Sequence, residues 1–450
     1  MTQSKRFLAS STADLPKAVA RKQAFEIREP EVARKAAIPG MTTFIRKSFR
    51  FAIFVLLAMN CIQATAQEKV LYTFSLGSGP DGGLIADAAG NLYGTTTFGG
   101  QYGHGSVFEL SPPVQAGKRW TEKTLYSFVA GSDLFEPEGS LVFDKLGNLY
   151  GTTIGAPNAD PGGIFELSPS GTGTWTESIL HIFSNTLSDG WYPETGLIID
   201  SAGKLYGTTY QGGTFEVGVV FQLVPPTGGG AWTENLLHVF TGASDGGYPT
   251  SRPLLKSGHL YGEVSFNGSN FGGLVYELTS GAGGVWTESV LYTFSGGTDG
   301  GDPAGQLVFD SKNGNFYGAT LEGGLGYGVV FDLAPSGSAW TQSVLYSFTN
   351  GSDGQKPAGG VVLDGTGALY GTSGTGGEGS CSSGFGCGSV FKLTPPSGSG
   401  AWTETTLYEF TGGNDGGESL APLLLRRGEL YGTAYTGGSA NGGVLFQLKP

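Results

Sequence analysis

The chain has 450 residues, of which 80 are glycine, with 38 acidic and 25 basic residues. Without the 11 basic and 4 acidic residues of 1–66, residues 67–450 keep 14 basic and 34 acidic residues, a net charge of −20. This charge disfavours nucleic acids and anionic membranes as partners, because both require a basic surface. No stretch after residue 67 keeps a 3.6-residue apolar period, which excludes a mainly helical fold.

The N-terminal segment has the layout of an export signal. Residues 51–59 form an apolar run between basic residues and a small-residue site ending at Ala66, and the run is too short to span a bilayer. We predict a signal peptide at 41–66, cleaved between Ala66 and Gln67, and a secreted or periplasmic protein without a mature transmembrane segment. Acylation of Cys61 is the alternative.

Upstream of the signal, residues 1–40 are interpreted as an upstream or disordered segment, because signal peptides have short basic starts. Residues 67–450 are predicted to form a single domain, and we expect it to be a monomer.

From residue 67 onward the chain repeats itself. The heptapeptide GNLYGTT occurs at 90–96 and again at 147–153, and near-copies follow at intervals of 53–61 residues. A fixed period of this kind indicates a repeat architecture. The Tyr-Gly pair marks each copy, at Tyr93, Tyr150, Tyr206, Tyr261, Tyr317, Tyr370 and Tyr431.

Each unit contains four strand-like runs separated by glycine-rich turns. In the unit 286–333 the runs are WTESVLYTF, QLVFD, NFYGAT and GVVFDL. Seven such units predict an all-β fold, a seven-bladed β-propeller of four-stranded blades. An open solenoid is the alternative. The chain starts on the LYTF run and stops on GVLFQL, so we expect the N-terminal strand to complete the last blade and close the ring.

One aspartate recurs per unit in the loop that enters the predicted innermost strand. Asp followed by Gly is typical of a turn in which the carboxylate caps its own loop. The alternative is that seven carboxylates on one face bind hydroxyl-rich ligands or a cation such as calcium. We expect no other cofactor, and the sequence does not specify a metal site. The series is Asp81, Asp133, Asp189, Asp245, Asp299, Asp353 and Asp415.

Aromatic residues accompany these aspartates. Trp191 and Tyr192 stand in the same loop as Asp189, and Tyr248 takes a similar place in the next unit. The glycine-rich loops after GxLYGTT should lie on the same face. They contribute Phe98, Tyr102, Phe215, Phe271 and Tyr327. Rings beside carboxylates suit sugars, so these residues and the aspartates form the predicted ligand face.

Histidines and cysteines are few. His181 and His238 replace the Tyr of the L-Y-x-F strand and are interpreted as packing residues. Cys381 and Cys387 lie in an insertion of the sixth unit and are predicted to form a disulfide; a two-cysteine metal site is the alternative, but zinc sites use four ligands. No catalytic signature such as GxSxG or HExxH occurs.

The combination of L-Y-x-F, D-G-x-x-P, G-x-L-Y-G-T-T and G-V-V-F-x-L resembles the GloVer repeat of bacterial choice-of-anchor tandem repeat proteins. The resemblance covers residues 68–450 in seven copies. It implies a secreted or surface-attached protein whose molecular role is undefined. The chain ends at Pro450 directly after the last predicted strand, so an anchoring tail is not expected.

Two functions fit these observations. The first is a secreted, non-catalytic binding or scaffolding propeller that recognises glycans or cell-surface proteins through the aspartate-loop face. The second is an extracellular polysaccharide-acting enzyme, a hydrolase or lyase, with axial carboxylates as acid and base. Fold class does not decide between them, because propellers carry unrelated activities.

Overall fold

The computed structural model describes most of the chain after residue 66. The described residues are 67–450 except Ala116, Ser132, residues 157–160, Thr172, Asn185, Asn270, Glu378 and residues 382–383. The chain divides into two compact units at residues 65 and 66, and the second unit contains everything described below. The predicted signal at 41–66, with Ala66 of its cleavage site, lies outside the described residues.

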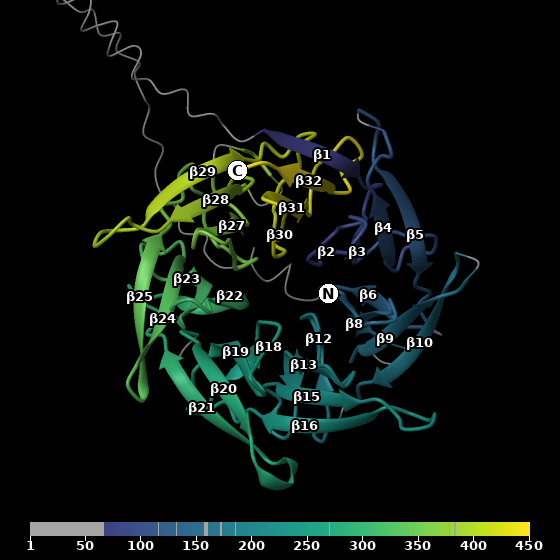
Figure 1. Cartoon of the computed structure of the whole chain (residues 1–450), viewed down its shortest axis with the longest axis horizontal. Coiled ribbons are helices and arrows are strands. Elements are labelled where there is room, and N and C mark those ends of the chain that lie inside the picture. Colours follow the sequence, from purple (N-terminus) through teal and green to yellow (C-terminus); the bar gives the residue numbers. More distant parts are fainter. Residues whose placement is uncertain are drawn as a thin grey trace, which may run out of the picture. The chain divides into compact units, whose positions relative to one another are not determined.

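The second unit is a ring of antiparallel blades, which confirms the predicted all-β, seven-bladed propeller (Figure 1). In blades 1 to 6 the strands run from the axis outward in chain order, and in blade 7 the outermost strand is the N-terminal β1. Blade 1 comprises β2 (Ile85–Ala86), β3 (Leu92–Thr96), β4 (Ser106–Ser111) and β5 (Thr121–Ser127). Blade 2 comprises β6 (Phe135–Pro137), β7 (Val142–Phe143), β8 (Leu149–Gly155), β9 (Gly163–Pro169) and β10 (Trp175–Ile182). Blade 3 comprises β12 (Ile198–Ile199), β13 (Leu205–Thr209), β15 (Val219–Val224) and β16 (Thr233–Val239), with the small pair β11 (Gly190–Trp191) and β14 (Gln211–Gly212).

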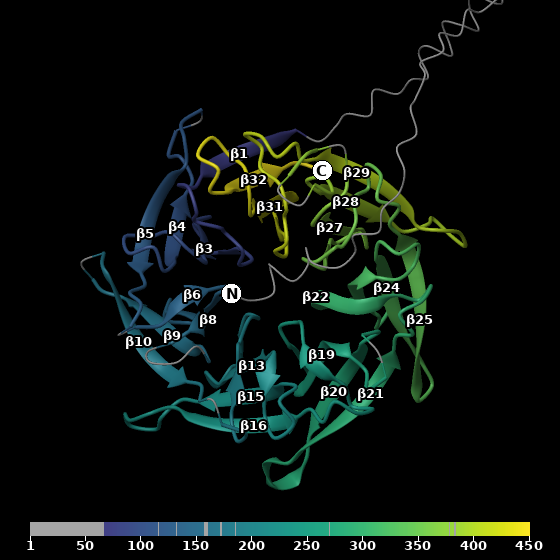
Figure 2. The ribbon, with the colours of Figure 1, turned by 180° about the vertical axis from the view of Figure 1, so that it is seen from behind.

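The remaining four blades repeat this order around the ring (Figure 2). Blade 4 comprises β17 (Gly247–Pro249), β18 (Leu254–Lys256), β19 (His259–Phe266), β20 (Leu274–Ser280) and β21 (Trp286–Thr293), with the short 3-10 turn η2 (Ala282–Gly284) before β21. Blade 5 comprises β22 (Gly301–Phe309), β23 (Phe316–Glu322), β24 (Val329–Ser336) and β25 (Ala339–Ser347). Blade 6 comprises β26 (Val361–Leu363), β27 (Leu369–Ser373), β28 (Ser389–Thr394) and β29 (Thr403–Glu409). Blade 7 comprises β30 (Leu424–Arg426), β31 (Glu429–Ala434), β32 (Val444–Leu448) and β1 (Glu68–Thr73).

The repeated heptapeptide is explained by contacts within the blade. A side chain at Gly94 would place its Cβ 2.7 Å from Cζ of Phe108 on the neighbouring strand. At the hairpin, Asp87 accepts hydrogen bonds from the backbone N–H of Gly90 (2.7 Å) and of Asn91 (2.9 Å). The Tyr-Gly pair is therefore fixed by a ring that covers the glycine, and the Gly-Asn pair by the capped turn.

The hydrophobic core lies in the seams between blades. In the seam of blades 1 and 2, Phe128 of the Y-x-F strand contacts Phe165 of the next blade, with ring centroids 5.2 Å apart. The same contact recurs at every seam, and this burial of apolar faces between neighbours holds the ring together. The equivalent pairs are Phe74–Phe108, Phe183–Phe221, Phe240–Tyr276, Phe294–Phe331, Phe348–Phe391 and Phe410–Phe446.

The two ends of the propeller meet in blade 7. Strand β1 pairs antiparallel with β32, from Glu68 opposite Leu448 to Thr73 opposite Val444 (Figure 1). Beyond the strand, the N–H of Phe74 donates to the carbonyl of Gly443 at 3.0 Å. The N-terminal strand is thus the outermost strand of the last blade, and its Phe74 makes the seam contact with blade 1.

Candidate functional site

Six aspartates of the predicted ring cap their own loops. Asp133 accepts a hydrogen bond from the Tyr126 hydroxyl at 2.6 Å, and Asp353 accepts from the Tyr346 hydroxyl at 3.0 Å and from the N–H of Thr349 at 2.7 Å. Asp299 and Asp415 are bound in the same way, while Asp189 and Asp245 face a histidine instead. These carboxylates bind groups of their own loop and of the strand before it, which agrees with the turn-cap interpretation.

Asp81 does not occupy the equivalent position. Its loop is shorter, and Asp81 directly follows Pro80, just as Glu138 follows Pro137 in blade 2. Glu194 after Pro193 is the blade 3 counterpart. Asp81, Glu138 and Glu194 therefore form their own series in three consecutive blades, on the segments that enter the innermost strands.

The three carboxylates of this series interact, and we call them the axial acids. A Cβ at Gly82 would lie 3.2 Å from the carbonyl oxygen of Glu138, so the segments of blades 1 and 2 are in contact. Burial raises the pKa of Asp81 to about 6. Burial and the charge of Asp81 raise the pKa of Glu194 to about 7, and burial together with the charges of Asp81 and Glu194 raises the pKa of Glu138 well above its usual range.

The residue that precedes this proline in blades 1 to 6, and the equivalent residue before Ser419 in blade 7, has a left-handed backbone. In blade 1 this residue is Gly79, with φ of 57°. In the other blades it carries a side chain at φ between 53° and 59°, a region that costs a residue with a side chain about 1–3 kcal/mol. The six are Glu136, Tyr192, Tyr248, Asp302, Lys356 and Glu418, and we call them the left-handed residues.

An interblade hydrogen bond imposes this conformation. The N–H of Tyr192 donates to the carbonyl of Pro161 (2.9 Å), and the N–H of Tyr248 donates to that of Val217 (2.6 Å). Each acceptor belongs to the glycine-rich loop of the preceding blade. The two loop types consequently share one face of the propeller, where all six left-handed side chains are partly exposed.

Exposed rings surround this face. Phe98, Tyr102, Phe215 and Phe271 are between 39% and 62% exposed on the glycine-rich loops, whereas Tyr327 packs partly into a seam. Closer to the left-handed residues, the rings of Tyr210 and Tyr248 lie 5.1 Å apart between centroids. Trp191 pairs with Gln211 through its backbone, and its buried Nε1 has no hydrogen-bond partner among the described residues.

Cys381 and Cys387 form a disulfide in the blade 6 insertion. The pair packs against the loop of blade 7, because a Cβ at Gly417 would lie 2.5 Å from the Sγ of Cys381. The carbonyl of Cys387 accepts the N–H of the left-handed Glu418 at 2.9 Å. The disulfide therefore fixes one loop of the same face.

Across the described residues, we find no helix with the length and apolarity needed to cross a membrane.

The repeat matches the model of a known family. The Gloeobacter/Verrucomicrobia repeat matches residues 59–265 and 251–450. The chain belongs to this family. The match confirms the resemblance seen in the sequence. No curated protein matches the chain.

The chain also matches parts of solved structures from several organisms. A putative oxidoreductase (glucose dehydrogenase) from Thermus thermophilus is 16% identical, with a TM-score of 0.39, over 68% of this chain and 94% of that one. A protein of unknown function from Dyadobacter fermentans is 12% identical, with a TM-score of 0.40, over 77% and 100%. A triple mutant of AofleA from Arthrobotrys oligospora is 11% identical, with a TM-score of 0.40, over 76% and 90%. Similarities at this level do not indicate what this protein does.

The sequence predicted that the two loop types share one face, but it did not single out the axial acids. It named Tyr192 and Tyr248 for their rings and Asp81 as a member of the aspartate series. It missed Glu138 and Glu194, although counting from the proline instead of from the Asp-Gly pair would have aligned them with Asp81.

Proposed function

We propose that this protein is an exported binding propeller that holds a hydroxyl-rich ligand, such as a glycan, on the face formed by the left-handed residues and the axial acids. The observation that carries the proposal is the series of left-handed residues. Gly79 shows that glycine fits the position without strain, yet six blades keep a side chain there. Strain of this kind accumulates where a side chain serves binding.

The chemistry of the face fits sugars. Carboxylates of the axial acids accept hydrogen bonds from hydroxyl groups, and Tyr192, Tyr248 and the exposed rings offer flat apolar surfaces for the C–H face of a sugar. The cations on these segments include Lys356 and Arg252, but acidic side chains predominate. A neutral or cationic ligand therefore fits this face better than an anionic one.

Export is supported by two features. Residues 41–66 have the layout of a signal peptide, and the Cys381–Cys387 disulfide is compatible with an oxidising compartment. A binding partner would accordingly be an extracellular glycan or a cell-surface protein.

Glycan-array screening tests the binding function. We expect a hit whose affinity falls at least about 10-fold when Tyr192→Gly and Tyr248→Gly are combined, because each change removes a contact ring. The melting temperature should stay nearly constant, because glycine relieves the left-handed strain. Leu146→Ala, an 83% exposed side chain in a hairpin outside the two loop types of the face, is the control and should change neither quantity. Full affinity in the double variant would contradict the proposal.

A second candidate function is glycoside hydrolysis. It is favoured by the axial acids, because burial raises the pKa of Asp81 to about 6 and that of Glu194 to about 7, so that at neutral pH Asp81 is mainly ionised and about half of Glu194 is protonated. If the array hit is a substrate, Asp81→Asn with Glu194→Gln should lower its hydrolysis rate by about 100-fold or more, while binding is retained. Asp200→Asn, in a capped hairpin outside the axial acids, is the matched control. If the glycan found on the array is bound but not cleaved, the result supports binding and contradicts hydrolysis.

A further inference from the structure

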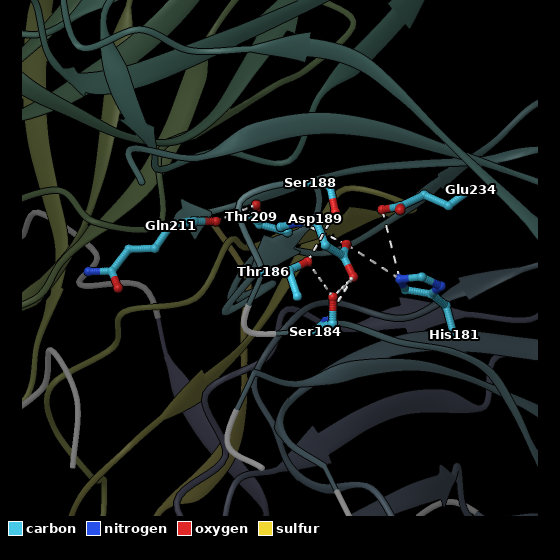
Figure 3. Close-up of polar contacts among 9 residues, drawn as sticks. His181, Ser184, Thr186, Ser188, Asp189, Thr209, Gln211 and Glu234 are labelled. Carbon is cyan, nitrogen blue, oxygen red and sulfur yellow. Dashed lines mark hydrogen bonds and ion pairs between the residues drawn. The ribbon is translucent and has the colours of Figure 1, made fainter. Parts of the chain in front are cut away.

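The seam between blades 2 and 3 brings together three groups that can bind a metal ion. His181 lies near the end of β10, Asp189 in the loop that follows, and Glu234 at the start of β16 in the next blade. Nε2 of His181 is 3.6 Å from Oδ1 of Asp189 and 3.8 Å from Oε1 of Glu234. All three ligand atoms lie within 4.8 Å of one another, and the side chains point toward a common space (Figure 3).

These atoms are not satisfied by hydrogen bonds to each other. Nε2 of His181 and Oε1 of Glu234 are buried, and neither has a hydrogen-bond partner among the described residues. Both distances from Nε2 exceed the range of a hydrogen bond. Where a histidine of this chain pairs directly with a carboxylate, as His259 does with Glu277, the distance is 2.8 Å. Buried polar atoms of this kind require a partner.

The loop fixes the aspartate for this role. Oδ2 of Asp189 accepts hydrogen bonds from the N–H of Ser184 at 2.7 Å and from its hydroxyl at 2.9 Å. Oδ1 accepts the N–H of Gly190 at 2.8 Å and faces His181 (Figure 3). Hydrogen bonds that orient a carboxylate in this way are typical of the surroundings of metal ligands.

Other seams lack this convergence. In the seam of blades 1 and 2, the Tyr126 hydroxyl donates directly to Asp133, so no gap remains. The seam of blades 3 and 4 contains His238, Asp245 and Glu288, but the part of the chain that the structure describes contains only the first trio within 4.8 Å. The two seams differ in the length of the loop between the histidine and the aspartate. His181 and Asp189 are eight positions apart, whereas His238 and Asp245 are seven positions apart.

We propose that His181, Asp189 and Glu234 bind one divalent first-row transition metal ion, represented by Zn²⁺, across this seam. One imidazole and two carboxylates suit such ions, whereas Ca²⁺ takes six to eight oxygen ligands. Ligand atoms about 2.0–2.2 Å from zinc lie roughly 3.3–3.6 Å apart in a tetrahedral site, close to the observed spacings. Three protein ligands leave one position for water, and the ion would tie two blades together.

Isothermal titration of the purified protein with Zn²⁺ tests the site. The protein carries no histidine tag and is stripped with a chelator beforehand. We expect one ion per chain and a rise in melting temperature with zinc, because an ion that binds only the folded state stabilises it. Failure to bind one zinc ion, or tighter binding of Ca²⁺ than of Zn²⁺, would overturn the proposal.

Two variants use residues that the chain already has at the equivalent positions. His181→Tyr installs the residue found in five other blades, and Glu234→Gln installs the residue that stands at Gln342. Both should fold, as circular dichroism melting would verify, and both should bind zinc at least about 10-fold more weakly. His238→Tyr in the neighbouring seam is the control and should bind zinc like the parent. Unchanged zinc affinity in both site variants would refute the assignment. The site lies between outer strands, so its test is independent of ligand binding at the axial acids.

Discussion

Deletion of residues 67–74 is expected to lower the melting temperature by more than about 10 °C and to broaden the transition. The deletion removes β1 from blade 7, and with it the buried Leu71 and Phe74, each worth about 2–5 kcal/mol in a well-packed core. It also exposes the edge of β32 and breaks the Phe74–Phe108 contact with blade 1. Scanning calorimetry of the truncated and full proteins gives the measurement.

Addition of the missing strand in trans is the control for this experiment. A synthetic peptide of residues 67–75 should bind the truncated protein and recover part of the lost stability, because it can pair with β32 as in the intact blade. A peptide of scrambled sequence should have no effect. A truncated protein that melts like the full one would show that β1 does not hold the ring closed.

Raising the pH from 5 to 8 is expected to lower the melting temperature by about 5 °C. Besides Glu234 of the proposed metal site, four glutamates of the outer strands face an aspartate of the preceding blade, and burial together with that charge raises the pKa of each to about 7. The pairs are Glu68 with Asp415, Glu177 with Asp133, Glu288 with Asp245 and Glu404 with Asp353.

The direction follows from proton linkage. Below pH 4.5 these glutamates are protonated in the folded and the unfolded chain alike, and their contribution is fully present. Between pH 4.5 and 7 the unfolded chain releases protons that the folded chain retains, so stability falls as pH rises and levels off above pH 7. Melting curves across this range measure the effect.

A variant with Gln at Glu68, Glu177, Glu288 and Glu404 provides the comparison. Blade 5 shows that the amide fits, because Nε2 of Gln342 donates to the carbonyl of Asp299 at 3.0 Å. The variant should lose the part of the pH dependence that these four glutamates supply and be the more stable protein at pH 8, while Asp81, Glu138, Glu194 and Glu234 keep their raised pKa values. A parallel decline in both proteins would assign the effect to other groups.

The fold could be predicted because its determinants are local and repeated. In the unit 286–333 the predicted runs WTESVLYTF, NFYGAT and GVVFDL correspond to β21, β23 and β24. The glycine of the Tyr-Gly pair and the aspartate of the hairpin act on neighbours within one blade, so their roles could be inferred from spacing alone.

The proposed ligand face was predictable only in part. Its loops could be placed from strand order, and Tyr192 and Tyr248 could be picked out as rings. Their left-handed backbone could not be predicted. It is imposed by a hydrogen bond from the backbone N–H of each tyrosine to a carbonyl of the preceding blade, against the local preference of tyrosine. The axial acids were missed because Asp81 resembles the Asp of an Asp-Gly turn while standing one position after a proline.

The proposed metal site could not be predicted from the sequence, for a different reason. His181 and Glu234 are 53 positions apart and belong to different blades. A histidine in place of the strand tyrosine was interpreted as packing, and its ring does contact Phe183 with centroids 4.7 Å apart. Only the seam shows that the other edge of that ring faces two carboxylates.

Because β1 pairs with β32, the boundaries of the sequence repeat differ from the boundaries of the blades by one strand. Every repeat that begins on a W-T-E strand contributes its first strand to one blade and its other three to the next. A gene duplication or loss that respects the repeat therefore never removes a whole blade cleanly. It cuts through two sheets at once, and the chain recovers only by forming new strand pairs in a ring with a different number of blades.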